Sequence, residues 1–306
     1  MTDDSTTDDH GVESTADTND EPPEEATEEP TDDGDGNDRL EGVAKAIERV
    51  DEPVTVDRLV ADLRELGVER GDTLIVHASM SSIGYVTGAS QAVVEALMAA
   101  VTDEGTLVMP THSHHIMDPA TFTAQPVPDD WEDPIRQSST PYRPAVTPTT
   151  GMGQVAETFR DYPDVRRSRH PTASFAAWGA DRDAVVEDQP YDPPMGEGSP
   201  LAAVYDLDGR VLRIGTEANT SLHLAEWRAP GETPIQKNGA PVLIDGEREW
   251  VTFEEVDGPE DLREAEAAFE EAGGTVHRGT VGAAETTLVS QPDLVDFAAK
   301  WFGENR

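Results

Sequence analysis

The strongest constraint on the fold lies between residues 73 and 110, where two apolar runs flank a loop and a helix. Thr73–His77 reads TLIVH, a β-branched stretch that is typical of a buried strand. A loop rich in Ser and Gly follows, Gln91–Val101 has the composition of a helix, and Thr106–Met109 forms a second apolar run before Pro110. This order predicts a β-loop-α-β unit with parallel strands.

The rest of the chain continues this alternation, with no internal repeat and no linker that divides residues 39 to 302. Apolar spacing predicts further helices at Leu40–Val50, Val56–Leu66, Gly153–Phe159, Pro200–Leu207, Ser221–Arg228, Glu260–Ala272 and Pro292–Phe302. Further strands are predicted at Ser174–Trp178 and Arg210–Ile214, with a hairpin around Asp245-Gly246. We expect an α/β fold: one domain, residues 39–306, whose central mixed, partly parallel sheet is flanked by helices.

The first 38 residues differ in composition from the rest. Residues 1 to 38 contain 16 acidic residues, no Lys or Arg, and few apolar side chains. Such a segment buries too little apolar surface to offset its ordering entropy. We therefore expect residues 1–38 to be a disordered acidic tail.

The charge of the whole chain limits its partners and its surroundings. With 63 Asp and Glu against 22 Lys and Arg, the formal net charge is −41, and nucleic-acid binding requires the opposite sign. Few of the basic residues are lysine, and such an acidic surface suits a cytoplasm at molar salt, where charges are screened over ~3 Å. No apolar run approaches the ~18 residues of a membrane span. We expect a cytoplasmic protein, monomer or homodimer, of a salt-adapted cell.

The loop after the first predicted strand is the leading candidate for a ligand site. It carries small residues, hydroxyl groups and two glycines, and it directly precedes a helix. Backbone N–H groups in such a position favour an anion or an oxyanion. The residues that we expect to contact a cofactor here are Ser79, Met80, Ser81, Ser82, Ile83 and Gly84.

Two further segments carry a histidine in a setting that suits acid–base chemistry. His170 lies in a turn that runs into a strand, where a general base can face a cleft. On the helix of residues 221–228, His223 and Glu226 are three residues apart and can share a face, so that the acid orients the ring and supports the imidazolium. The alternative for Glu226 is a surface ion pair with Arg228 or Arg213.

A third cluster contains the histidines His112, His114 and His115. On an extended strand His112 and His114 would point to the same side, where both could bind one metal ion. A metal-dependent hydrolase is therefore an alternative. Zinc sites, however, need three or four convergent ligands, and the sequence offers no HExxH motif. Without cysteine, no thiolate nucleophile or Cys-ligated metal is possible. We therefore expect no bound metal.

Together these segments resemble the aminoglycoside 3-N-acetyltransferase family. The resemblance covers about residues 55 to 302 and leaves out the acidic tail. It is carried, in order, by the motifs HASMSSIGYVTG (77–88), GTLVMPTHS (105–113), TPTTGMG (147–153), RSRHPTASFAAWG (167–179), GEGSPL (196–201), NTSLHLAEWRA (219–229) and VGAAETTLVSQPDLVDFAAKW (281–301).

The resemblance implies an acetyl-CoA-dependent transferase that acetylates the 3-amino group of the 2-deoxystreptamine ring of an aminoglycoside, by direct transfer. It places the catalytic base at His170 and its partner acid at Glu226. It extends the coenzyme contacts from Ser79–Gly84 to Thr147, Gly151 and Gly153. Because salt screens the long-range repulsion by this acidic chain, we also expect Arg166, Arg167 and Arg169 to attract the coenzyme phosphates at short range. Acceptor contacts fall on His112, Asn219 and His223. Alternatives are the same chemistry on another small amine and a non-catalytic binding module.

Overall fold

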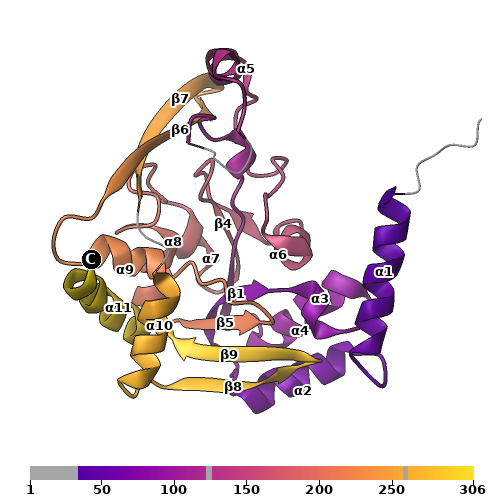
Figure 1. The fold of residues 1–306 in the computed structure, drawn as a ribbon. Helices are drawn as coiled ribbons and strands as arrows, with labels where there is room; N and C mark the ends of the chain where they lie inside the picture. The colour runs from indigo at the N-terminus through magenta and orange to yellow at the C-terminus, as the bar shows by residue number, and fades with distance from the viewer. Residues whose placement is uncertain (1–33, 122–125, 258–260) are drawn as a thin grey trace, which may run out of the picture.

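The computed structural model describes residues 34–121, 126–257 and 261–306. Its centre is a seven-stranded sheet with helices on both faces (Figure 1). Strand β1 pairs in parallel with β2 and with β5, and the other neighbours are antiparallel. In spatial order the strands are β3 (Arg166–Arg167), β4 (Phe175–Gly179), β2 (Thr106–Pro110), β1 (Thr73–Ala78), β5 (Arg210–Ile214), β9 (Ala284–Ser290) and β8 (Val276–Val281). The predicted mixed, partly parallel sheet is confirmed.

Alternate side chains of β1 separate two apolar cores, because successive residues of a strand point to opposite faces. Leu74 and Val76 belong to one core and Ile75 to the other. The first face is covered by α2 (Val56–Leu66), α4 (Ala89–Val101) and α6 (Gly153–Arg160). The second is covered by α7 (Arg182–Val186), α8 (Pro200–Asp206), α9 (Leu222–Arg228), α10 (Leu262–Glu271) and α11 (Gln291–Asn305).

A long hairpin rises from this layered body beside the irregular segment that follows β2 (Figure 1). Strands β6 (Ile235–Ile244) and β7 (Glu247–Val256) form it, and their pairing is antiparallel throughout. In the described residues of the segment after β2, the regular elements are the 3₁₀ turns His114–Ile116 and Asp129–Trp131 and the short helix α5 (Glu132–Ser138). No element in the described part of this segment is longer than the seven residues of α5.

One hairpin of the sheet was missed in the strand predictions. The hairpin of β8 and β9 was not predicted, because β8 is largely exposed and lacks a buried apolar alternation. Helix α1 (Gly34–Glu48) starts within the segment that was assigned to the acidic tail. Residues 1–33 of that tail lie outside the described residues.

Helix α1 projects from the body, and its last turn contacts the short helix α3 (Met80–Ile83) after β1 (Figure 1). Gly84 ends α3 at φ +94°. A Cβ atom there would lie 2.6 Å from Cγ1 of Val50. The absence of a side chain at Gly84 therefore lets the residues after α1 pack against this loop. Every helix in the described ranges is too short or too polar to cross a lipid bilayer.

We expect Gly84→Ala to lower the free energy of unfolding, and Val50→Ala to relieve part of that loss. The added Cβ overpacks against Val50, which costs about 1–3 kcal/mol, in addition to the strain of the positive φ. A double-mutant cycle measured by urea unfolding separates the two effects, because only the clash depends on Val50. Additive losses in the double variant would show that Val50 does not pack on this glycine.

Candidate active site

Helix α9 presents a paired histidine and carboxylate. Nδ1 of His223 lies 2.7 Å from Oε2 of Glu226, three residues along the helix. A carboxylate can only accept, so Nδ1 carries the proton, and Nε2 is the nitrogen left to accept another. The pairing predicted from the helical spacing of these residues is confirmed.

The Glu226 side chain is buried, with 4% of its surface exposed. Its second oxygen, Oε1, accepts a hydrogen bond of 2.8 Å from Nη2 of Arg306. Buried neighbours Leu224 and Ala225 fix the helix against the apolar core of this face. Glu226 therefore has two partners, and neither is His170. The alternative ion pairs with Arg228 or Arg213 are wrong as well, because those arginines bind Glu197 and Glu266.

His170 is fully buried, and backbone groups occupy both ring nitrogens. Nδ1 accepts from the amides of Thr172 and Ala173, at 3.3 and 2.9 Å. Nε2 donates to the carbonyl oxygen of Tyr191 at 3.1 Å, and the edge of Phe253 packs against the ring. Burial lowers the pKa of His170 to about 4. The prediction that Glu226 steadies His170 is wrong, because this imidazole instead closes a turn.

His223 lines a pocket of about 240 Å³ between α9, the segment after β2 and strand β7. We call it the histidine pocket. Three imidazoles meet there with one carboxyl group and several apolar side chains. Its lining consists of His112, His114, Pro194, Met195, Thr220, His223, Trp227, Glu255 and Val256.

The other imidazoles of the histidine pocket are held neutral. Burial, and then the charge that His114 would carry, lowers the pKa of His112 well below its usual value. Burial also lowers the pKa of His114, with His115 and His223 adding to the effect. Nε2 of His112 is buried and has no hydrogen-bond partner among the described residues. It is therefore free to bond to a molecule in the pocket.

Glu255 is the one carboxyl group among the lining residues of the histidine pocket. It accepts a hydrogen bond of 2.8 Å from Nδ2 of Asn238. Burial raises the pKa of its carboxyl group, against that hydrogen bond and the nearby His223. No sequence pattern indicated Glu255, because the β6–β7 hairpin brings it to α9 from a distant part of the chain.

The residues that follow β1, 79 to 84, form a compact turn that we call the serine loop. The Ser79 amide donates to the carbonyl oxygen of Ile214 at 2.9 Å, and Ser82 Oγ donates to that of Gly215 at 3.1 Å. The Ser82 amide donates to the Ser79 carbonyl oxygen within the turn. This one amide is thus not available to an oxyanion, although we expected the backbone N–H groups of this loop to favour one.

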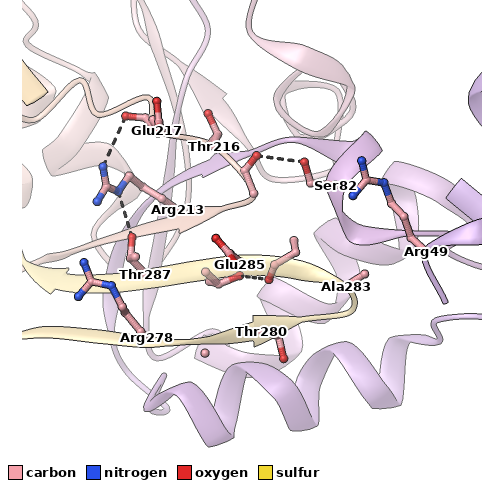
Figure 2. Close-up of a pocket in the computed structure, with 14 residues that line it drawn as sticks. Arg49, Ser82, Arg213, Thr216, Glu217, Arg278, Thr280, Ala283, Glu285 and Thr287 are labelled. Carbon is pink, nitrogen blue, oxygen red and sulfur yellow. Dashed lines mark hydrogen bonds between the residues drawn. The ribbon is translucent and has the colours of Figure 1, made fainter. Parts of the chain in front are cut away.

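On the outer side of the serine loop lies a larger pocket of about 960 Å³, which we call the arginine pocket (Figure 2). In Figure 2 Arg49 lies at the Ser82 end and Arg278 at the other. Arg213 donates to Thr287 Oγ1, at 3.0 Å, and to Glu266. Arg49 has no hydrogen bond or ion pair to any described residue. The pocket is lined by Arg49, Ser82, Arg213, Gly215, Thr216, Glu217, Arg278, Gly279, Thr280, Ala283, Ala284, Glu285, Thr286 and Thr287.

Of the other predicted coenzyme residues, Gly153 lies close to the end of β1. A Cβ atom on Gly153 would lie 3.6 Å from the carbonyl oxygen of Ala78, which places the start of α6 beside the end of β1. Gly151 has a positive φ just before it. Thr147 instead closes its own turn, since its hydroxyl accepts from the Arg143 amide at 2.9 Å.

Asn219 and the arginines around residue 167 make internal contacts. The Asn219 side chain donates to Glu266 and accepts from the Ser221 amide, so it fixes the entry to α9. Arg167 donates to the carbonyl oxygens of Thr111 and Thr147 and to neighbouring hydroxyl groups. It is therefore not free to bind a phosphate. Arg166 and Arg169 form ion pairs with Asp183 and Asp188, respectively.

The three histidines after β2 do not act as one group. His112 and His114 enter the histidine pocket, whereas Nδ1 of His115 lies 2.7 Å from Thr150 Oγ1. In the part of the chain that the structure describes, no three His, Asp or Glu side chains are grouped to hold a metal ion.

Comparisons with known proteins agree on one family. The model of the aminoglycoside 3-N-acetyltransferase family matches residues 75–303. The SPbeta prophage-derived aminoglycoside N(3')-acetyltransferase-like protein YokD of Bacillus subtilis is 42% identical over 265 residues, 85% of this chain and 97% of that protein. Aminoglycoside N(3)-acetyltransferase VII of Streptomyces paromomycinus is 40% identical over 276 residues, 84% of this chain and 94% of that enzyme.

Solved structures show the same likeness in three dimensions. The crystal structure of YokD matches with a TM-score of 0.82 and covers 86% of this chain and 98% of its own. A structure of AAC-IIIb, described as binary with CoASH, is 29% identical and matches with a TM-score of 0.72. It covers 83% of this chain and 97% of its own.

The burial of His170 leads to a prediction for stability against pH. Its folded pKa of about 4 lies below the ordinary 6.5, so the unfolded chain binds a proton first as the pH falls. The stabilisation by neutral His170 is complete above 6.5 and is lost as the pH falls towards 4, by up to about 1.4 kcal/mol per pH unit.

We expect His170→Asn to remove this contribution, so that the variant loses less stability than the wild type between pH 6.5 and 4. Urea unfolding of both proteins across this pH range measures the difference between their free energies of unfolding. Other titrating groups, such as His77, contribute equally to both proteins and so do not affect this difference. Parallel curves would contradict the assignment of His170 as a buried neutral ring.

Proposed function

The chain belongs to the aminoglycoside 3-N-acetyltransferase family, and from this membership we propose that it transfers the acetyl group of acetyl-CoA to an amine bound beside His223. The observation that carries the proposal is the His223–Glu226 pair at the wall of the histidine pocket. It supplies an oriented imidazole with one free nitrogen, and such a base suits the deprotonation of an attacking amine.

His223 acts as the general base of this reaction. The acceptor nitrogen bonds to the thioester carbonyl carbon as Nε2 of His223 takes one of its protons. The carbon–sulfur bond then breaks, and the proton goes on to the leaving thiolate. Glu226 holds Nδ1–H and balances the charge that the ring gains. No covalent intermediate on the protein is needed, which suits a chain without cysteine.

The coenzyme supplies an activated acetyl thioester, and the arginine pocket fits the remainder of that molecule. Its volume of about 960 Å³ falls in the range of ligand sites. Its arginine side chains suit phosphate groups, and Arg49 has no partner within the described chain. Ser82 links this pocket to the serine loop, where the resemblance places coenzyme contacts. The arginine side chains and the place of Ser82 support binding of coenzyme A in the arginine pocket.

An aminoglycoside is the acceptor that we propose, with its 2-deoxystreptamine ring in the histidine pocket and its 3-amino group at His223. The pocket of about 240 Å³ holds one ring of such a molecule and leaves the rest outside. Glu255 and the unpartnered Nε2 of His112 provide acceptors for amino and hydroxyl groups. The same small volume, with one carboxyl group, also favours a second candidate, a small monoamine.

We expect His223→Ala to lower kcat by about 10²–10⁴-fold, because the reaction loses its base. His170→Asn, a matched exchange of the other predicted histidine, should keep most of the activity at neutral pH, where the protein remains folded. Release of the coenzyme thiol at saturating acetyl-CoA measures both. An active His223→Ala together with a folded, inactive His170→Asn would reverse the assignment.

The acceptor is tested with pairs of aminoglycosides that differ only in whether the 3-amino group is free or already acetylated. We expect thiol release with the free compounds alone, and we expect His112→Phe to raise KM for the acceptor without changing KM for acetyl-CoA. A monoamine sugar such as glucosamine serves as the competing acceptor class. Turnover of that amine, with none of any 2-deoxystreptamine compound, would establish the second candidate instead.

A further inference from the structure

Arg306 reaches the active-site carboxylate from the end of helix α11. Its Nη2 lies 2.8 Å from Oε1 of Glu226, the oxygen that does not contact His223. The same guanidinium binds Asp261 through Nη2 at 2.6 Å and through Nε at 3.1 Å. Its Cζ also lies over the ring of Phe302, 4.0 Å from the centroid. With only 12% of the side chain exposed, Arg306 is held in one place.

These contacts form a chain of charges: Asp261, Arg306, Glu226 and His223. In the parts of the chain that the structure describes, Arg306 is the one Arg or Lys that contacts Glu226. A buried carboxylate with one oxygen unpaired is costly, and the guanidinium compensates its charge at Oε1. A charged group held at one oxygen also restricts rotation of the carboxylate, which fixes the other oxygen towards the ring.

Other charged or titratable groups face His223 from other elements. His77 lies on β1, His112 and His114 follow β2, and Glu255 lies on β7. None of them contacts Glu226. Arg228, on the same helix as the pair, turns away to Glu197, 2.7 Å from its Nε. The link from Arg306 to His223 through Glu226 is therefore separate from the pocket lining.

We propose that Arg306 is a positioning residue that sets the proton affinity and the orientation of His223 through Glu226. The Arg306 guanidinium and the His223 ring contact the same carboxylate. The positive charge of Arg306 therefore offsets part of the negative charge that would otherwise stabilise a protonated ring. The ring is then in its base form at lower pH than it would be beside an unshared carboxylate. The inference rests on the proposed role of His223, but it can be measured without catalysis.

The test compares Arg306→Gln, Arg306→Lys and the control Arg228→Gln. The control removes the same charge from a nearby arginine that does not touch Glu226. The titration of the His223 ring is followed by NMR in the substrate-free protein, with the resonance assigned by its loss in His223→Ala. The pH profile of kcat/KM is measured alongside, and thermal unfolding confirms that each variant is folded.

In Arg306→Gln we expect the midpoint of the His223 titration to rise by about 0.5–1 pH unit, since an opposing charge nearby shifts titration by about this much or more. The acidic limb of the kcat/KM profile should move with it, while KM for acetyl-CoA stays the same. Arg306→Lys should restore most of the wild-type midpoint, and Arg228→Gln should leave it in place.

An unchanged midpoint in a folded Arg306→Gln, or an equal shift in Arg228→Gln, would overturn the inference. If Arg306→Gln does not fold, the inference is tested with Arg306→Lys alone. It then requires the His223 titration in that variant to keep its wild-type midpoint, and a changed midpoint in a folded Arg306→Lys would contradict it. The proposed function fails in a different way: the His223 midpoint would respond to Arg306, but the kcat/KM profile would not follow it.

Discussion

The Glu226 carboxylate is buried, and the structure around α9 compensates its charge from two sides. An isolated buried carboxylate is strongly unfavourable, whereas one with partners at both oxygens is tolerated. His223 supplies one partner from the same helix and Arg306 the other from the end of α11. This requirement links the side of α9 that lines the histidine pocket to the side that packs in the core. The fold can bury the acid only where the histidine and the arginine are both in place.

The loop between β5 and α9 then determines how the two pockets are arranged. Strands β1 and β5 run in parallel, so the serine loop and the β5–α9 loop leave the sheet at the same edge, where ligands commonly bind in α/β sheets. Gly215 and Glu217 border the arginine pocket, while Thr220 borders the histidine pocket. Thr220 also lies 3.4 Å from Nε2 of buried His77. One short loop therefore separates the larger arginine pocket from the smaller histidine pocket.

How far the sequence predicted this arrangement depends on the range of the interactions. The β1–α4–β2 unit and the His223–Glu226 pair were predicted, because both depend on local periodicity. The role of His170 was not, since its partners are backbone groups of a turn and a carbonyl of Tyr191. Glu255 and Arg306 were missed for the same reason: no spacing rule relates a hairpin strand or a final helix to residue 226. Motif order identified the family but not which of two histidines faces a pocket.

In so acidic a chain, the arginines with ion pairs can be compared with Arg49, which has none among the described residues. With 22 Lys and Arg against 63 Asp and Glu, almost any basic side chain can find a carboxylate, and several arginines here bind one or more. Arg213 and Arg306 each meet buried or partly buried acids. Arg49, in contrast, has no ion pair within the described chain, although it lies at a pocket that also contains glutamates. A cation kept unpaired under such competition favours an anionic ligand from outside, which is the chemistry that coenzyme phosphates offer.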